Sequence, residues 1–249
     1  NTGDALTTGF DNVAIGRSAL TTEDTGRKNV AIGSSALESQ NGDADNYNVA
    51  VGFEAGKEVT TGTQNTIIGG LAGDALTTGS NNVVVGAFAL SADDLGSFNV
   101  ALGYNTLAAM NFASATDSYN TAVGGRAGQA ITTGTLNTLI GGLAGDAITT
   151  GAANVAVGYR SLSATTTASS NTAIGVDALT SNTTGTSNTA VGRDTLNQQT
   201  TASYNTALGH QALNLNSSGA NNTASGYRAL YANTTGTQNT AVGAEALDA

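Results

Sequence analysis

The chain carries one short motif fourteen times: an Asn followed four residues later by a Gly, with small or β-branched residues between them. Eleven of the thirteen spacings between successive copies are seventeen residues. The other two are nineteen, after Asn29, and twenty-one, after Asn99, so two and four residues are inserted there while the flanking motifs stay intact. A fixed short period that tolerates insertions indicates a modular repeat array.

We number each repeat from its motif Asn, which is position 0, so that the motif Gly is position +4. Stacked repeats would place equivalent side chains about 4.8 Å apart, a spacing at which one Asn amide can donate a hydrogen bond to the carbonyl of the next. We interpret the Asn row as a structural ladder, and we expect the Gly to turn the chain out of a strand through a positive φ angle. The ladder residues are Asn12, Asn29, Asn48, Asn65, Asn82, Asn99, Asn120, Asn137, Asn154, Asn171, Asn188, Asn205, Asn222 and Asn239. The turn residues are Gly16, Gly33, Gly52, Gly69, Gly86, Gly103, Gly124, Gly141, Gly158, Gly175, Gly192, Gly209, Gly226 and Gly243.

The residues between the Asn and the Gly predict a strand. Positions +1 and +3 are mostly β-branched, as in Val13 and Ile15, whereas position +2 is Ala in eleven of fourteen copies. Because side chains alternate across a strand, we expect +1 and +3 to face one way and +2 the other. Two short strands per repeat, with a second turn near the Thr-Thr-Gly stretches, predict an all-β fold. The predicted architecture is a parallel β-roll or β-solenoid of about fourteen 17-residue coils, one repeat domain over residues 1–249.

Such a coil would hold only one or two aliphatic side chains per layer and would leave the Ala row at +2 bare. A long bare apolar stripe on a soluble protein indicates an interface. Cyclic association of identical chains would cover the stripe along its whole length. The pattern therefore predicts that the main partner of this chain is itself.

The composition restricts the function. A net charge of −10 with eight basic residues argues against nucleic-acid binding, which needs clustered Lys and Arg. Residues 1–117 hold thirteen acids and four bases, and residues 118–249 hold five and four. We interpret the acid excess as a solvated surface rather than a cation site.

The chain has no Cys and no run long enough for a membrane helix, so we expect no disulfide and no membrane insertion by this segment. Both ends fall within a repeat, which predicts a segment of a longer fibre.

No residue pattern predicts catalysis. His210 is the only histidine and follows Gly209 at a variable position, so we interpret it as a surface residue. The acid pairs Glu23–Asp24 and Asp93–Asp94 lie in polar stretches, where solvated carboxylates are the default. We expect no enzyme activity, no cofactor and no metal site.

Aromatic side chains and the inserted loops are the candidates for recognition. Aromatic residues recur directly after the turn Gly, where they can hold sugars or simply cover backbone. The insertions at residues 41–47 and 111–119 each end on a Tyr, and loops on a rigid scaffold often carry recognition. The candidate ligand contacts are Tyr47, Phe53, Tyr104, Tyr119, Tyr159 and Tyr227.

The repeat resembles those of known fibres. The Asn-Val-Ala-Ile-Gly units at Asn12–Gly16 and Asn29–Gly33, followed by a small residue such as Ala19, resemble the head repeats of trimeric autotransporter adhesins. The sequences NTAVG at Asn188–Gly192 and NTTG at Asn233–Gly236 are similar to repeat arrays in phage tail fibres and related trimeric bacterial fibres. The resemblance implies a left-handed roll, three copies side by side, and an extracellular place on a bacterial surface or a phage particle. The adhesin repeats are shorter than seventeen residues, which predicts an enlarged second turn here.

Two classes of function follow. The first is a structural or adhesive fibre segment that forms a homotrimer and spaces or presents recognition of a host glycan or protein. The second is a monomeric ice-binding or surface-adsorbing solenoid, suggested by Thr rows such as Thr77–Thr78 and Thr149–Thr150. Such a solenoid needs a flat, regular Thr face, and Asp93–Asp94 and Gln198–Gln199 interrupt these rows.

Overall fold

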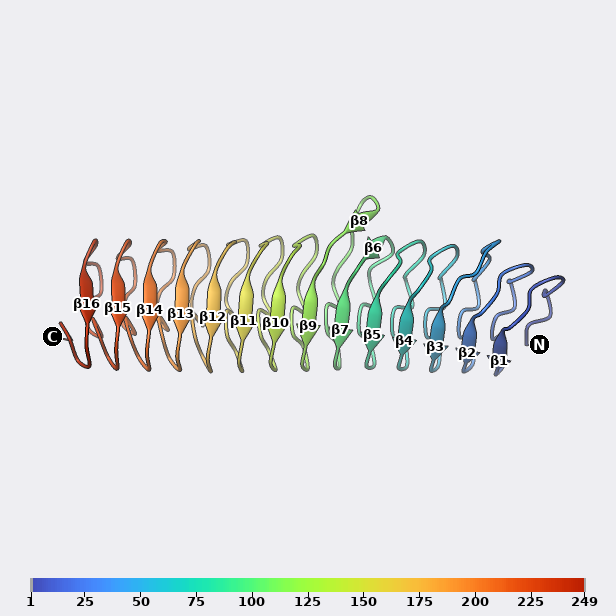
Figure 1. Cartoon of the computed structure of the whole chain (residues 1–249), viewed down its shortest axis with the longest axis horizontal. Helices are drawn as coiled ribbons and strands as arrows, with labels where there is room; N and C mark the ends of the chain where they lie inside the picture. The colour runs from blue at the N-terminus through green and yellow to red at the C-terminus, as the bar shows by residue number, and fades with distance from the viewer. Residues whose placement is uncertain (1, 249) are drawn as a thin grey trace. The chain divides into compact units, whose positions relative to one another are not determined.

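The computed structural model describes residues 2–248, and the chain is an all-β parallel β-solenoid of about fourteen turns with repeats of about seventeen residues. We call each turn of the solenoid a coil. The chain divides into two compact units, Asn1–Gly125 (unit 1) and Arg126–Ala249 (unit 2). Each unit has its own stack of parallel strands (Figure 1).

Each coil contributes one three-residue strand, at positions +1 to +3, and strands of successive coils pair in parallel with equivalent residues opposite, as in Val13↔Val30 and Thr172↔Thr189. The strands of unit 1 are β1 (Val13–Ile15), β2 (Val30–Ile32), β3 (Val49–Val51), β4 (Thr66–Ile68), β5 (Val83–Val85), β7 (Val100–Leu102) and β9 (Thr121–Val123). Those of unit 2 are β10 (Thr138–Ile140), β11 (Val155–Val157), β12 (Thr172–Ile174), β13 (Thr189–Val191), β14 (Thr206–Leu208), β15 (Thr223–Ser225) and β16 (Thr240–Val242).

The second insertion adds a small parallel pair to unit 1. The strand β6 (Gly96–Ser97) pairs with β8 (Thr116–Asp117). In Figure 1 the segment that leads into β8 stands out from the row of coils. The insertion therefore grows outwards while β7 and β9 pair directly beneath it.

The prediction of two strands per repeat is wrong. The second half of each coil is a series of turns in which position +6, position +8 and the residue just before the next ladder Asn have left-handed backbone, with Leu or Gly at +8. That last residue is +16 in a seventeen-residue repeat, and we keep the label +16 for it in the two coils with insertions, where it is Tyr47 or Tyr119. Left-handed backbone redirects the peptide N–H towards a neighbouring coil. Leu20 donates its backbone N–H to the carbonyl of Ala36 in the next coil (3.1 Å), and Asn81 donates to that of Thr63 in the previous one (3.0 Å). Hydrogen bonds between coils thus satisfy the backbone outside the strands as well.

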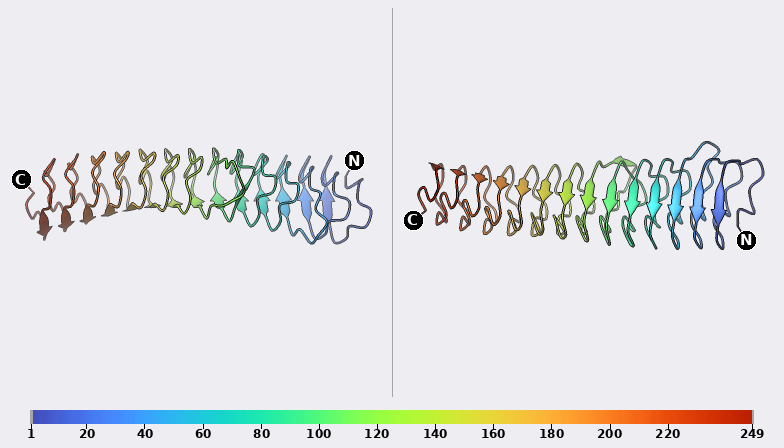
Figure 2. Two further views of the ribbon diagram at one scale, coloured as in Figure 1. Left: turned by 90° about the horizontal axis from the view of Figure 1, so that it is seen from above. Right: turned by 60° about the horizontal axis from the view of Figure 1, so that its bottom comes forward.

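The predicted assignment of the two strand faces is also wrong. Position +2 points into the coil, where Ala31, Ala101 and Ala190 are fully buried, whereas +1 and +3 point outwards and are half-buried or exposed. In the left view of Figure 2 the strands of each unit lie on one side of the coils and the irregular segments on the other. Small side chains at +2 and +7 leave room for Leu at +8, which reaches the interior from the irregular side. The Ala row is therefore core, not a bare stripe.

The residues at +8 and +11 fill the interior of a coil in one of two combinations. Where +8 is Gly, +11 is a buried aliphatic residue. A Cβ added to Gly145 would lie 2.7 Å from Ile148 Cδ1 and 2.9 Å from Leu139 Cδ2, so these side chains occupy the space that Leu fills elsewhere. Where +8 is Leu, +11 is a buried polar residue in every described coil with a full repeat except those of Met110 and of Asn233, which is half-buried. The Gly type is represented by Gly56 with Val59, Gly73 with Leu76 and Gly145 with Ile148, and the Leu type by Leu20 with Glu23, Leu90 with Asp93, Leu179 with Asn182 and Leu213 with Asn216.

Candidate functional site

The outward face of the strands is the most distinctive surface of the molecule. It consists of positions +1 and +3, and none of these 28 positions holds a charged residue. All but Leu102, Leu208 and Ser225 are β-branched. We call this surface the charge-free face. Its side chains are half-buried or exposed, with Ile15 57% and Leu208 51% exposed, so solvent reaches it in both units.

Exposed hydrophobic groups of the chain gather on this face and its two edges. Among the described residues, every large hydrophobic side chain that is clearly exposed lies at +1, +3, +5 or +16, except Phe10, Phe88 and Leu247. Positions +16 and +5 are the residues just before the ladder Asn and just after the turn Gly, so they border the strand at its two ends. Contiguous apolar surfaces of this kind are typical of interaction surfaces.

The ladder Asn residues lie inside the coils, beside the strands. The Oδ1 atom of each accepts the backbone N–H of the next ladder Asn within a unit, as in Asn82 to Asn99 (2.9 Å) and Asn171 to Asn188 (3.0 Å). The Nδ2 group donates to the carbonyl at +14 of its own coil, as in Asn82 to Gly96 (2.9 Å). The ladder thus joins successive coils mainly by hydrogen bonds from a backbone N–H to an Asn side chain. At some steps the two Asn side chains also bond each other, with Nδ2 to Oδ1 distances of 3.1–3.3 Å.

The two insertions interrupt this pattern. In the coil with the first insertion, Nδ2 of Asn29 is buried without a hydrogen-bond partner. In the coil with the second, Nδ2 of Asn99 donates to Oδ1 of Asn82 (3.1 Å) and to the carbonyl of Ser97 (3.3 Å), both before it in the chain. The cross-coil bond from Oδ1 to the next backbone N–H survives in both coils, at 3.2 Å.

The turn Gly residues have φ angles of 125° to 144°. This backbone region is open essentially to Gly alone. A Cβ on Gly158 would also lie 2.5 Å from the carbonyl oxygen of Gly175 in the next coil. Both the conformation and the close stacking of the coils therefore require Gly here.

The six candidate ligand contacts are all exposed, by 46% to 58%. They occupy the two edges of the charge-free face: Phe53, Tyr104, Tyr159 and Tyr227 at +5, and Tyr47 and Tyr119 at +16. Three contact another ring: Tyr104 packs edge-on against Phe88 (6.0 Å between centroids), Tyr119 stacks on Phe98 (5.0 Å) and Tyr227 lies 5.7 Å from His210. The six do not converge on one pocket, and they form rows along the solenoid instead.

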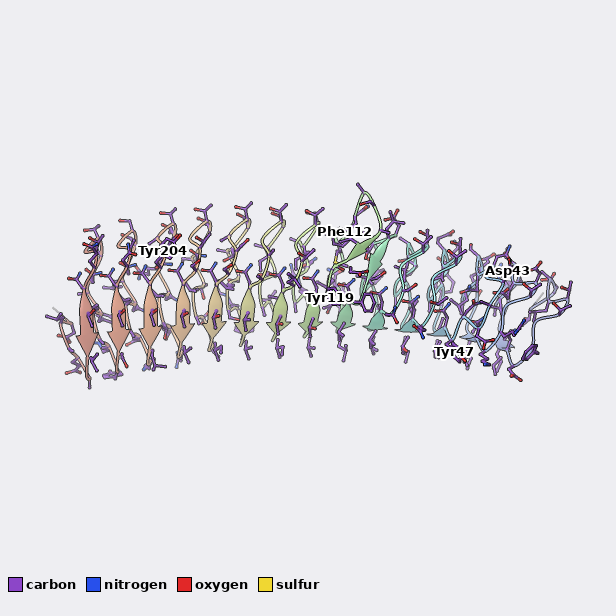
Figure 3. All side chains as sticks on the ribbon, turned by 45° about the horizontal axis from the view of Figure 1, so that its top comes forward. Asp43, Tyr47, Phe112, Tyr119 and Tyr204 are labelled. Carbon is purple, nitrogen blue, oxygen red and sulfur yellow. The ribbon has the colours of Figure 1, made fainter. Side chains whose placement is uncertain are left out.

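The first insertion is anchored by polar contacts. Lys28 Nζ donates to Asp45 Oδ2 (2.6 Å) and to the Tyr47 hydroxyl (2.9 Å). The hydrogen bond from Lys28 lowers the pKa of the Asp45 carboxyl, and the bonds to Asp45 and Tyr47 raise the pKa of Lys28. In Figure 3, Asp43 and Tyr47 lie well apart although they come from one insertion.

The second insertion is held by apolar contacts. Met110 is fully buried and Phe112 is 5% exposed. Figure 3 places Phe112 below the protruding tip of this loop. The residues of the tip, Ala113 to Ala115, are exposed. The insertion thus has its own small anchor on unit 1.

The interpretation of the acid pairs as solvated is wrong for one member of each. Glu23 and Asp93 are fully buried at +11. Both oxygens of Glu23 accept hydrogen bonds, from the N–H of Gly26 (2.7 Å) and Gly42 (3.3 Å) and from Nδ2 of Asn46 (3.1 Å). Asp93 Oδ1 accepts from Gly96 N–H (3.2 Å), and Oδ2 has no partner. Burial raises the pKa of Glu23, and it raises the pKa of Asp93 to about 6.

His210 is exposed, and its Nε2 lies 3.8 Å from Asp194 Oδ2. No group of three or more His, Cys, Asp or Glu side chains in residues 2–248 is arranged to hold a metal ion. That part of the chain also contains no helix with the length and apolar character that a bilayer span requires. Comparison of the chain with models of protein families, with curated proteins and with solved structures found no match.

Proposed function

We propose that this chain is a structural and adhesive fibre segment whose copies associate side by side through the charge-free face as a homotrimer. It would space or present recognition of a host glycan or protein, outside the cell, on a bacterial surface or a phage particle. The observation that carries the proposal is the charge-free face: 28 uncharged, mostly β-branched positions that point to solvent in a chain with 18 acidic and 8 basic residues.

A second copy of this chain fits the charge-free face better than an unrelated partner. The face repeats once per coil, with a step of about 4.8 Å, the spacing of paired strands. A partner can match such a surface over many coils only if it has the same step. Another copy has this step, and closed symmetric association buries the same face on every chain. The motifs shared with trimeric adhesin heads and tail fibres support three copies and a left-handed coil.

The test is the mass of the purified chain in solution, measured by light scattering after size exclusion. We expect three times the 24.5 kDa of one chain. Val83→Glu and Ile174→Glu each place a carboxylate on the face, one in each unit, and should dissociate the copies because a buried unpaired charge is costly. Thr78→Glu adds the same charge at an exposed position of another side and should leave the mass unchanged. A monomeric wild-type chain would refute the proposal.

One observation favours the alternative of a monomeric ice-binding or surface-adsorbing solenoid. The Thr pairs near the second turn are irregular, but six of the seven strands of unit 2 begin with Thr, at Thr138, Thr172, Thr189, Thr206, Thr223 and Thr240. These residues lie in register on the charge-free face, as in Thr206↔Thr223. A monomer that shows thermal hysteresis, lost on Thr206→Tyr, would establish this alternative in place of the fibre.

A further inference from the structure

The basic residues of unit 2 lie along one edge of the solenoid. Its four arginines, Arg126, Arg160, Arg193 and Arg228, each follow the turn Gly by one or two positions, and unit 2 has no Lys. They are 34, 33 and 35 residues apart, which is one Arg in every second coil. Two coils correspond to about 10 Å along the solenoid. We call positions +5 and +6 of unit 2 the arginine edge.

Three of the four arginines occupy the same position of their coil. Position +6, which carries Arg126, Arg160 and Arg228, has left-handed backbone in every described coil, and Arg193 lies one residue before it, at +5. Arg160 donates its backbone N–H to the carbonyl of Gly142 (3.1 Å), and Arg228 donates to that of His210 (3.0 Å). These two backbone hydrogen bonds fix the points at which the Arg160 and Arg228 side chains leave their coils.

Two of the four arginines have an aromatic ring beside them in the same coil. Tyr159 and Tyr227, both at +5, are 51% and 46% exposed. The ring of Tyr159 lies against Gly142, where an added Cβ would be 3.6 Å from the ring, and the ring of Tyr227 lies beside His210. Each ring is supported by the preceding coil and remains half open to solvent. Such rings offer an amphipathic surface for the C–H face of a sugar.

Carboxylates complete the edge. Asp177 Oδ1 lies 3.7 Å from Arg160, and Asp194 Oδ2 lies 3.2 Å from Arg193 Nε. Glu245 continues the +6 row after Arg228. These pairs are on the surface and leave guanidinium N–H groups free, since Arg has five and Arg193 remains 69% exposed. The edge therefore presents donors, acceptors and rings together.

We propose that the arginine edge binds a linear acidic polysaccharide that carries one carboxylate per disaccharide. A disaccharide is about as long as two coils, so one acidic group can meet each Arg while the sugar rings next to Arg160 and Arg228 lie on Tyr159 and Tyr227. Hydroxyl groups pair with Asp177, Asp194 and the free guanidinium N–H groups. A nucleic acid fits less well, because its closely spaced phosphates require denser positive charge than four Arg among five acids.

This inference names the ligand class of the adhesive role proposed above and rests on that role, but it does not require association of copies. The experiment uses the whole chain and three immobilised probes: hyaluronan, with one carboxylate per disaccharide; dextran, which is uncharged; and polyphosphate, which is densely charged. Binding is measured by interferometry at physiological salt, and the mass is measured on the same samples. We expect binding to hyaluronan at least tenfold tighter than to dextran or polyphosphate.

Matched variants identify the site. Arg193→Gln and Tyr159→Ser should each weaken hyaluronan binding about tenfold, the effect of losing one charge-assisted hydrogen bond or one stacking contact. Arg17→Gln, at an exposed +5 position of unit 1, and Tyr204→Ser, at an exposed +16 position of unit 2, make the same changes away from the arginine edge and should leave binding unchanged. No binding to hyaluronan, equal losses in these two controls, or tighter binding to polyphosphate would overturn the inference. A monomer that binds hyaluronan at the edge would refute the homotrimer and leave the inference standing.

Discussion

Units 1 and 2 are built from the same coil and differ in what that coil carries. Unit 1 holds both insertions, thirteen acids against four bases, and Val at +1 in five of its seven strands. Unit 2 keeps a spacing of seventeen throughout, holds five acids against four bases, and has Thr at +1 in six of seven strands. At the buried +11 position, unit 1 uses Glu23 and Asp93 where unit 2 uses Asn182 and Asn216. The same coil backbone thus accommodates different surface charges and, at the buried position +11, either an acid or an amide.

The largest effect should be shared by both units. Gly86→Ala in unit 1 and Gly158→Ala in unit 2 each force a Cβ onto a φ angle of 132° and against the carbonyl of the next coil. We expect each to lower the free energy of unfolding by at least about 3 kcal/mol. Urea denaturation followed by circular dichroism would measure it. A loss below about 1 kcal/mol in one unit would show that the two scaffolds are not equivalent.

The Asn ladder should distinguish the units. Asn171→Ala in unit 2 removes the hydrogen bonds that Oδ1 accepts from the N–H and Nδ2 of Asn188 and the bond that Nδ2 donates to the Gly185 carbonyl, and should cost about 3 kcal/mol. Asn29→Ala in unit 1 removes one bond, to Asn48 N–H, because Nδ2 of Asn29 has no partner. It should cost about 1 kcal/mol. Urea midpoints of the two variants would test the difference, and equal losses would mean that the first insertion does not weaken the ladder.

The buried acids should make the stability of unit 1 depend on pH. Burial raises the pKa of Asp93 from 3.8 to about 6, so the folded chain holds its proton more tightly than the unfolded chain. Stability then falls as pH rises from about 4 to about 6 and stays reduced above that. Asp93→Asn should remove this fall and raise stability at pH 7 by up to about 3 kcal/mol. Thermal unfolding at pH 4, 5, 6 and 7 would measure it.

The matched change in unit 2 is Asn182→Asp, which places a carboxylate at the same buried position. It should introduce the pH dependence that Asp93→Asn removes, with lower stability at pH 7 than at pH 4. If Asp93→Asn leaves the pH profile unchanged, Asp93 is not the group that titrates.

The smallest effect on stability is expected on the charge-free face. Val83→Thr in unit 1 and Thr189→Val in unit 2 exchange the residue types of the two units at exposed +1 positions. Each should change the free energy of unfolding by less than about 0.5 kcal/mol. If copies associate through this face, Val83→Thr should weaken the association and Thr189→Val should strengthen it, measured as the concentration at which the mass falls. Opposite shifts would contradict an apolar contact.

The sequence alone was sufficient to predict the period, the parallel coils and the placement of the insertions, because a strict repeat carries these directly. The orientation of the strand was predicted wrongly, because alternation identifies two faces without saying which is inside. The decisive group was Leu at +8, such as Leu20, which enters the core from left-handed backbone that no strand pattern reveals. The buried acids could have been found by alignment of the repeats, since Asp93 falls on the column of Asn182. The absence of charged residues at +1 and +3 can also be read from the sequence alone.

The ladder gives each unit a direction. Within a unit, the Oδ1 of each ladder Asn accepts the backbone N–H of the next ladder Asn. A folded coil therefore presents a positioned hydrogen-bond acceptor to the coil that follows it. The interactions between coils are then nearest-neighbour terms, and a coil added at the growing end finds its template already in place. During synthesis from the N-terminus, the chain can therefore fold coil by coil, because each new coil pairs with the coil that has just folded before it.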